Sequence, residues 1–128
     1  MSASVRAELG SVSIVLAAGI LVVLVLTMGV ADLGSVLAAR ARARSGADAA
    51  ALAVAQELAF PTGREAVEVA ADYTTRNGTE LVSCWCADGT FDVTVEVRAA
   101  VGGLTLFPGS LVVSQRARAV VDLPSGTP

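Results

Sequence analysis

The sequence VSIVLAAGILVVLVLTMGVA, residues 12–31, is the most informative part of this chain because it contains no charged side chain. In a helix these 20 residues rise about 1.5 Å each and cover about 30 Å, the thickness of a bilayer's hydrocarbon core. The hydroxyl groups of Ser13 and Thr27 can hydrogen-bond to carbonyl groups of the same helix. The stretch therefore predicts a transmembrane helix near the N-terminus.

Two other interpretations of this stretch are less consistent with the sequence. A cleaved secretory signal has an apolar region of about 7–15 residues, followed closely by a small-residue cleavage site. Here the A-x-A motif at residues 41–43 lies well downstream of the apolar stretch. A buried helix in a soluble protein would need a core on every side, and a chain of 128 residues is too short to supply one. We therefore favour a membrane anchor.

The composition argues against several classes of function. The 9 basic residues are all arginine, and with 12 acidic residues they give a net charge of -3. No basic stripe alternates with aromatic residues, so nucleic-acid binding is not expected. The chain has no histidine, the commonest general base and transition-metal ligand. We expect no catalysis, metal, cofactor or small-molecule substrate.

The two cysteines, Cys84 and Cys86, flank Trp85. In a strand, residues two apart point to the same face, so a disulfide between them is accessible in an oxidising compartment, although the ring is short. As a metal site the pair supplies half of a tetrahedral set, and as a redox site its spacing is C-x-C instead of C-x-x-C. We favour a structural role, either as a bridge or as two small apolar strand residues.

The helix is expected to continue beyond the membrane. Residues 32–58 contain no proline and are rich in good helix formers, and Pro61 with Gly63 ends the helix. Small side chains dominate residues 46–55 and allow another helix to approach closely. We predict a helix-packing interface at Gly46, Ala47, Ala50 and Ala51.

A short helix and a sheet are expected after this point. Residues 64–76 predict a second helix, closed by Asn77-Gly78, with an apolar side formed by Ala66, Val67, Ala70, Ala71 and Tyr73. The period then changes to two. Strands are predicted at residues 79–86 and 91–99, joined by an Asp-Gly turn, and at residues 111–121.

The predicted fold class is α+β and pilin-like, with a long N-terminal helix, a short second helix and a small antiparallel sheet. Residues 1–60 form the transmembrane and stalk helix after a short polar lead, residues 61–123 a small extracytoplasmic domain, and residues 124–128 a disordered tail. The outer half of the helix is expected to pack against Phe91, Val93, Val95 and Val97. On the other face, Arg116 and Arg118 are expected across from Glu96 and Asp92.

Several segments together resemble the TadE/TadG-like family of tight-adherence (Flp-type) pilus assembly proteins. They are GSV at residues 10–12, ADL at 31–33, ARARSGADAAALA at 41–53, LTLFP at 104–108 and RARA at 116–119. The chain is most similar to the short TadE-like proteins encoded beside secretion ATPase genes in GC-rich bacteria. Many pseudopilins of this system have a glutamate five residues after a processing glycine, whereas this chain has Val15 after Gly10. This departure argues for an N-terminus that stays as a permanent anchor.

The resemblance implies a non-enzymatic, single-pass protein that is a pilin-like component or assembly factor of a Tad/Flp-type pilus or secretion system. Its implied partners are membrane lipid and other pilin-like or Tad-system membrane proteins. Residues 40, 42 and 44 are arginines, which would favour a cytoplasmic C-terminal part, but they begin nine residues beyond the apolar stretch. The cysteine pair and the resemblance favour the cytoplasmic membrane with the N-terminus inside and the C-terminal domain outside. The alternative is an anchored binding or thiol-redox module that uses Cys84 and Cys86.

Overall fold

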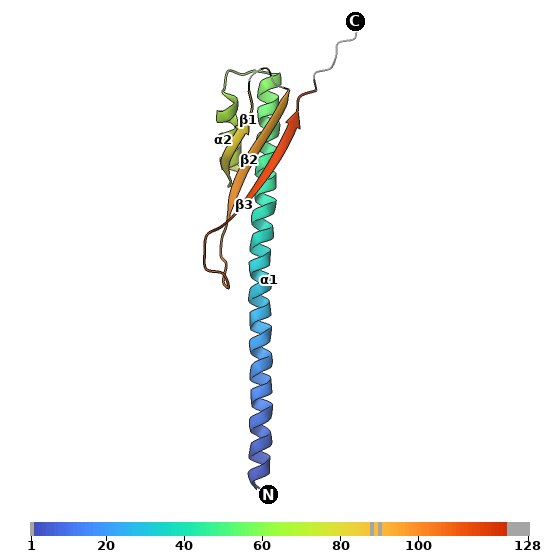
Figure 1. The fold of residues 1–128 in the computed structure, drawn as a ribbon, viewed down its shortest axis with the longest axis vertical. Helices are drawn as coiled ribbons and strands as arrows, with labels where there is room; N and C mark the ends of the chain where they lie inside the picture. The colour runs from blue at the N-terminus through green and yellow to red at the C-terminus, as the bar shows by residue number, and fades with distance from the viewer. Residues whose placement is uncertain (1, 88, 90, 123–128) are drawn as a thin grey trace.

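The computed structural model describes the backbone of residues 2–87, 89 and 91–122, with the side chains of these residues apart from 2–9 and 11. It contains a long helix α1 (Ser2–Ala59), a short helix α2 (Ala66–Arg76), and strands β1 (Glu80–Trp85), β2 (Asp92–Val101) and β3 (Leu111–Val120). The predicted α+β fold is confirmed (Figure 1). The predicted disordered tail, residues 124–128, lies outside the described residues.

Helix α1 is continuous over 58 residues and is about 87 Å long. It ends at Ala59, two residues before Pro61, as the sequence predicts. Its start differs from the prediction, because the helix begins at Ser2 and the expected polar lead is helical. The segment at residues 2–9 contains neither proline nor glycine and includes alanine, arginine, glutamate and leucine, so nothing in it interrupts a helix.

The three strands form an antiparallel sheet in the order β1-β2-β3, which packs against the C-terminal half of α1 (Figure 1). Strand β2 alternates as predicted, and Val93, Val95 and Val97 are completely buried. The prediction was wrong for Phe91, which is 55 % exposed. Phe91 lies in the bend before β2, outside the strand's alternation, and its carbonyl accepts a hydrogen bond from the Val121 amide.

Alanines on α1 form the other side of the core. The buried residues of α1 include Ala43, Ala47, Ala50, Ala51 and Val54, and they belong to one cluster with the valines of β2. Because alanine has no side chain beyond Cβ, the sheet and α2 can lie close to the backbone of α1. We call residues 39–59 of α1, together with α2 and the three strands, the head.

Helix α2 also packs against α1, with a buried side slightly different from the predicted one. Its buried residues are Ala66, Val69, Ala70 and Thr74, whereas Val67 is 53 % exposed. The buried positions are spaced by three, four or eight residues from Ala66, as one face of a helix requires. Val67 is rotated about 100° from Ala66 and therefore points away from this face.

Candidate membrane anchor and its junction with the head

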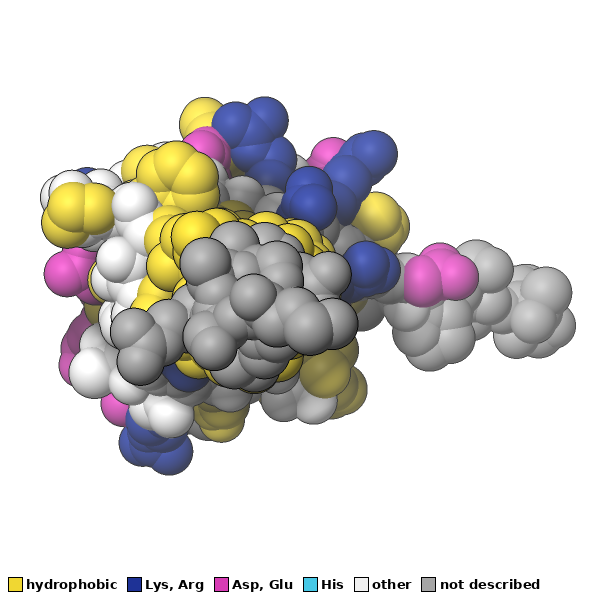
Figure 2. Space-filling model, turned by 90° about the horizontal axis from the view of Figure 1, so that it is seen from below, with side chains coloured by type: hydrophobic (Ala, Val, Ile, Leu, Met, Phe, Trp, Pro, Cys, Tyr) yellow, Lys and Arg dark blue, Asp and Glu magenta, His cyan; other side chains and the backbone are white. Residues whose placement is uncertain are grey.

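The apolar segment, residues 12–31, is largely uncovered by the rest of the described chain, and Leu106 approaches it at Gly29. Its large hydrophobic side chains are between 44 % and 72 % exposed and lie on every side of α1. Seen from the N-terminal end, hydrophobic side chains surround the axis of α1, and charged groups lie farther out (Figure 2). The Thr27 hydroxyl donates to the Val23 carbonyl at 2.8 Å, so this polar group is satisfied within the helix. Among the described residues, α1 is the one helix long and apolar enough to cross a membrane.

An acidic residue at the end of the apolar segment is bound by a distant loop. Asp32 is 4 % exposed and is covered by residues 102–110, which connect β2 to β3 and which we call the Asp32 loop. The carboxylate accepts hydrogen bonds from the Thr105 amide and hydroxyl, both at 2.8 Å, and from the Leu106 amide at 2.9 Å. Three donors compensate for the water that the buried carboxylate has lost.

The Asp32 loop runs beside α1 on the N-terminal side of the sheet (Figure 1). An apolar hollow of about 630 Å³ lies between the loop and α1, and its lining includes Leu33, Val36, Leu104 and Phe107. Leu106 contacts α1 at a glycine, since a Cβ built on Gly29 would lie 3.8 Å from Leu106 Cδ1. Phe107 is 71 % exposed. The junction between the apolar segment and the head is therefore apolar apart from the satisfied Asp32.

No role for Asp32 or for its loop was predicted from the sequence. Two signals were present in the sequence: an isolated acid in the otherwise uncharged residues 12–39, and an uncharged loop rich in leucine and glycine. Neither signal reveals that the two segments, 73 residues apart, lie together.

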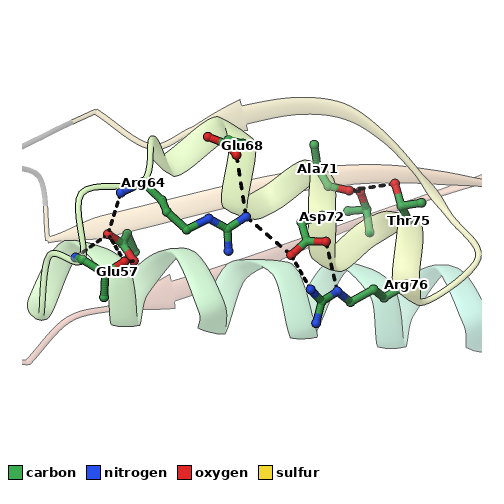
Figure 3. Close-up of polar contacts among 9 residues, drawn as sticks. Glu57, Arg64, Glu68, Ala71, Asp72, Thr75 and Arg76 are labelled. Carbon is green, nitrogen blue, oxygen red and sulfur yellow. Dashed lines mark hydrogen bonds and ion pairs between the residues drawn. The ribbon is translucent and has the colours of Figure 1, made fainter.

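A second carboxylate, Glu57, fixes the C-terminal end of α1. Glu57 accepts hydrogen bonds from the Thr62 amide at 2.6 Å, the Thr62 hydroxyl at 2.7 Å and the Arg64 amide at 3.3 Å. The Thr62 hydroxyl is the main cause that lowers the pKa of Glu57, and the Thr62 amide adds to it. Figure 3 shows Glu57 near Arg64, whose side chain extends toward Asp72 of α2. Asp72 also pairs with Arg76 at 2.9 Å.

The residues of the predicted helix-packing interface lie inside the head. Ala47, Ala50 and Ala51 are at most 2 % exposed, and Gly46 is also buried. A Cβ built on Gly46 would lie only 2.5 Å from Thr79 Oγ1. In this fold the small residues allow close approach by elements of the same chain, including α2 and the residue before β1.

The cysteine pair lies at the end of β1. Cys84 and Cys86 are joined by a disulfide, and their Cα atoms are 5.4 Å apart, within the range that disulfides span. Both are partly buried and pack against the core cluster. Trp85 points to the other face, where the Arg116 guanidinium lies 5.1 Å from its ring centroid. Within the described part of the chain, no group of three or more His, Cys, Asp or Glu side chains is placed to hold a metal ion.

Ion pairs cross the outer face of the sheet as the sequence predicts. Arg116 pairs with Glu96 at 2.7 Å, and Arg118 Nε lies 2.7 Å from Asp92 Oδ1. The hydrogen bond from Arg118 lowers the pKa of Asp92, and the same contact raises the pKa of Arg118. Apart from the partly buried Glu96, these groups are exposed to solvent, so such pairs contribute little to stability.

A comparison with known families agrees with the resemblance predicted from the sequence. The family model described as putative Flp pilus-assembly TadE/G-like matches residues 10–57. We call these matched residues the TadE/G-like segment. The TadE/G-like segment contains the apolar segment, Asp32 and the alanines that α1 buries in the head, and it ends at Glu57. No curated protein and no solved structure matches the chain.

Proposed function

We propose that this chain is a non-enzymatic, single-pass protein of the cytoplasmic membrane that acts as a pilin-like component or assembly factor of a Tad/Flp-type pilus or secretion system. The observation that carries the proposal is the division of one continuous helix. Residues 12–31 of this helix have exposed apolar side chains on every side, and residues 39–59 are built into the head. The TadE/G-like match covers both parts of this helix.

The proposed orientation places the N-terminus in the cytoplasm and the head, including residues 61–123, outside the membrane. The disulfide between Cys84 and Cys86 supports this orientation, because disulfides persist in oxidising compartments. By a simple count of positive charges, the arginines at positions 40, 42 and 44 would favour the opposite orientation. They lie on the rigid helix beyond the apolar segment, nine residues or more from its end.

The orientation can be tested by labelling a single cysteine. Ser114 is exposed on β3, and Ser114→Cys can be introduced after both native cysteines have been replaced by serine. An impermeant thiol reagent should label this variant in intact spheroplasts. The matched control is the cysteine-free chain without Ser114→Cys, which should stay unlabelled. Labelling of Ser114→Cys only after lysis would reverse the proposed orientation.

The assembly role requires a test in the cell that encodes the chain. Deletion of the gene should abolish surface pili or secretion through the Tad-type system, and the wild-type gene should restore them. The detergent-solubilised wild-type chain should also co-purify with membrane proteins of that system. Pili and secretion that continue unchanged in the deletion strain would contradict the proposed role.

A further inference from the structure

We propose that the Asp32 loop is a second membrane contact, with its apolar tip in the interfacial layer of the bilayer and lipid acyl chains filling the hollow beside α1. This inference rests on the proposed function, because it assumes that the apolar segment spans the bilayer. It adds that the head is held against the membrane surface instead of standing free on its helix.

The distribution of charge supports this position for the loop. Residues 99–115, which include the whole Asp32 loop, contain no charged side chain. On α1, residues 12–39 contain a single charge, Asp32, and the loop's donors satisfy it. The arginines at 40, 42 and 44 begin just beyond this uncharged region, at a level suited to lipid phosphate groups.

The length of the uncharged part of α1 agrees with this placement. Residues 12–39 cover about 42 Å in a helix, whereas the hydrocarbon core is about 30 Å thick and the whole bilayer with its headgroups about 40–45 Å. The loop contacts α1 between Gly29 and Val36, where the apolar segment leaves the hydrocarbon core. The apolar surface of the loop is therefore continuous with the membrane-spanning surface.

The side chains of the loop fit an interfacial environment. Phe107 is 71 % exposed, and Leu33 and Leu37 on α1 are 58 % and 54 % exposed. Phe107 and Leu33 line the same hollow and form an apolar patch there that water solvates poorly. The hydrogen bonds to Asp32 satisfy the amide groups of Thr105 and Leu106, which removes two polar groups that a lipid environment would penalise.

Tryptophan fluorescence in lipid vesicles tests the inference. The full chain carries Trp85→Phe, which removes its one native tryptophan, and then receives a single tryptophan by Phe107→Trp, Phe91→Trp or Leu24→Trp. Phe91 is the matched control, because it is an exposed phenylalanine at the opposite end of β2. Each protein is reconstituted into phosphatidylcholine vesicles whose acyl chains carry a bromine or nitroxide quencher at a shallow or a deep position.

The expected result is a blue-shifted emission from position 107 that loses most of its intensity with the shallow quencher. The fluorescence of a tryptophan at position 24 should be quenched by the deep quencher, and that of a tryptophan at position 91 by neither quencher. Asp32→Asn in the Phe107→Trp chain should reduce the quenching, because it weakens the contacts that hold the loop. Unchanged quenching in that variant would overturn the role of Asp32 in placing the loop.

The three positions separate this inference from the proposed function. If position 24 is quenched and position 107 is not, the second membrane contact is wrong and the anchor stands. If position 24 is not quenched, the membrane-spanning assignment itself fails. A blue shift at position 107 without lipid quenching, growing with protein density in the vesicles, would mean that another copy of the chain covers the loop, and would overturn the proposed lipid contact.

Discussion

The two halves of α1 have the same backbone and opposite surroundings. In the apolar segment, large valine, leucine and isoleucine side chains point outward in all directions. In the head, the side chains facing the sheet and α2 are mostly alanine, and the exposed side includes Arg44 and Asp48. The difference shows that the size of the side chains, as well as their polarity, matches the surroundings of each half of α1. Lipid accommodates large side chains, whereas a sheet and a helix packed closely on α1 leave room only for small ones.

The difference between the two halves of α1 can be tested by introducing the same charged residue into each of them. Leu24→Arg should remove much of the chain from carbonate-washed membranes, because an arginine at the centre of a spanning helix costs about 2.5–3.5 kcal/mol. Leu52→Arg is the matched control, since Leu52 is 59 % exposed in the head and Leu24 is 51 % exposed in the apolar segment. If both variants remain in the membrane fraction to the same extent, the idea that one half of α1 lies in lipid and the other in water is contradicted.

Close packing in the head can be tested with two glycines of the same helix. Gly46→Ala should destabilise the head by about 1–3 kcal/mol, because the added methyl group would collide with Thr79, whose hydroxyl donates to the Thr74 carbonyl. Gly34→Ala should stabilise α1 by up to about 1 kcal/mol, because a Cβ there meets no atom within 4 Å. Denaturant unfolding of the solubilised chain, followed by Trp85 fluorescence, measures both changes. Equal effects of the two substitutions would contradict close packing at Gly46.

The carboxylate at the head end of α1 predicts a pH dependence. Hydrogen bonds from Thr62 hold the pKa of Glu57 below its ordinary value of 4.5, so the ionised form stabilises the fold. This contribution is complete above the ordinary value and is lost as the pH falls through the lower pKa of the folded state. Between pH values of about 6 and 3, the wild type should therefore lose more stability than Glu57→Gln does. Glu65→Gln is the control, because the Glu65 side chain makes no capping hydrogen bond to α2. A Glu57→Gln profile identical to that of the wild type would contradict the role of this carboxylate.

The smallest effect is expected on the outer face of the sheet. Arg118→Gln removes the pair with Asp92, and its effect on stability should be slight and should decrease in high salt, because these groups are exposed and screened. By contrast, Val95→Ala on the inner face should cost about 2 kcal/mol, because it leaves a cavity in the core. Unfolding measured at low and high salt distinguishes the two. A large, salt-independent loss in Arg118→Gln would show that this face is covered.

The sequence predicted those parts of the fold that follow from local periodicity. The alternation in β2 predicted both the buried valines and the pairs of Arg116 and Arg118, because a strand turns successive residues to opposite faces. The prediction of the buried side of α2 was less accurate, because a small error in the rotation of the helix about its axis exchanges Val69 for Val67. The periodicity also did not show that Phe91 lies before the first residue of β2.

The long-range contacts of Gly46 and Asp32 could not be predicted from the sequence. The alanine and glycine residues at 46–51 indicate that something approaches α1 closely, but their composition does not distinguish a second membrane helix from α2 and Thr79 of the same chain. The Asp32 contact depends mainly on backbone amides of the loop, and backbone groups have no signature in the sequence. Such contacts are fixed by the path of the chain after β2, which only the folded structure reveals.

The alanine face of α1 also has a consequence for the order of events during synthesis. Residues 43–54 emerge from the ribosome early, yet Ala117 of β3, which belongs to the same core, is made more than sixty residues later. At about 5–20 residues per second, this face waits several seconds for its last strand. Alanine and interspersed arginine are too weakly hydrophobic for the waiting half to be taken up as a second span. The small side chains that permit tight packing in the finished protein therefore also disfavour insertion of this half of α1 into the membrane.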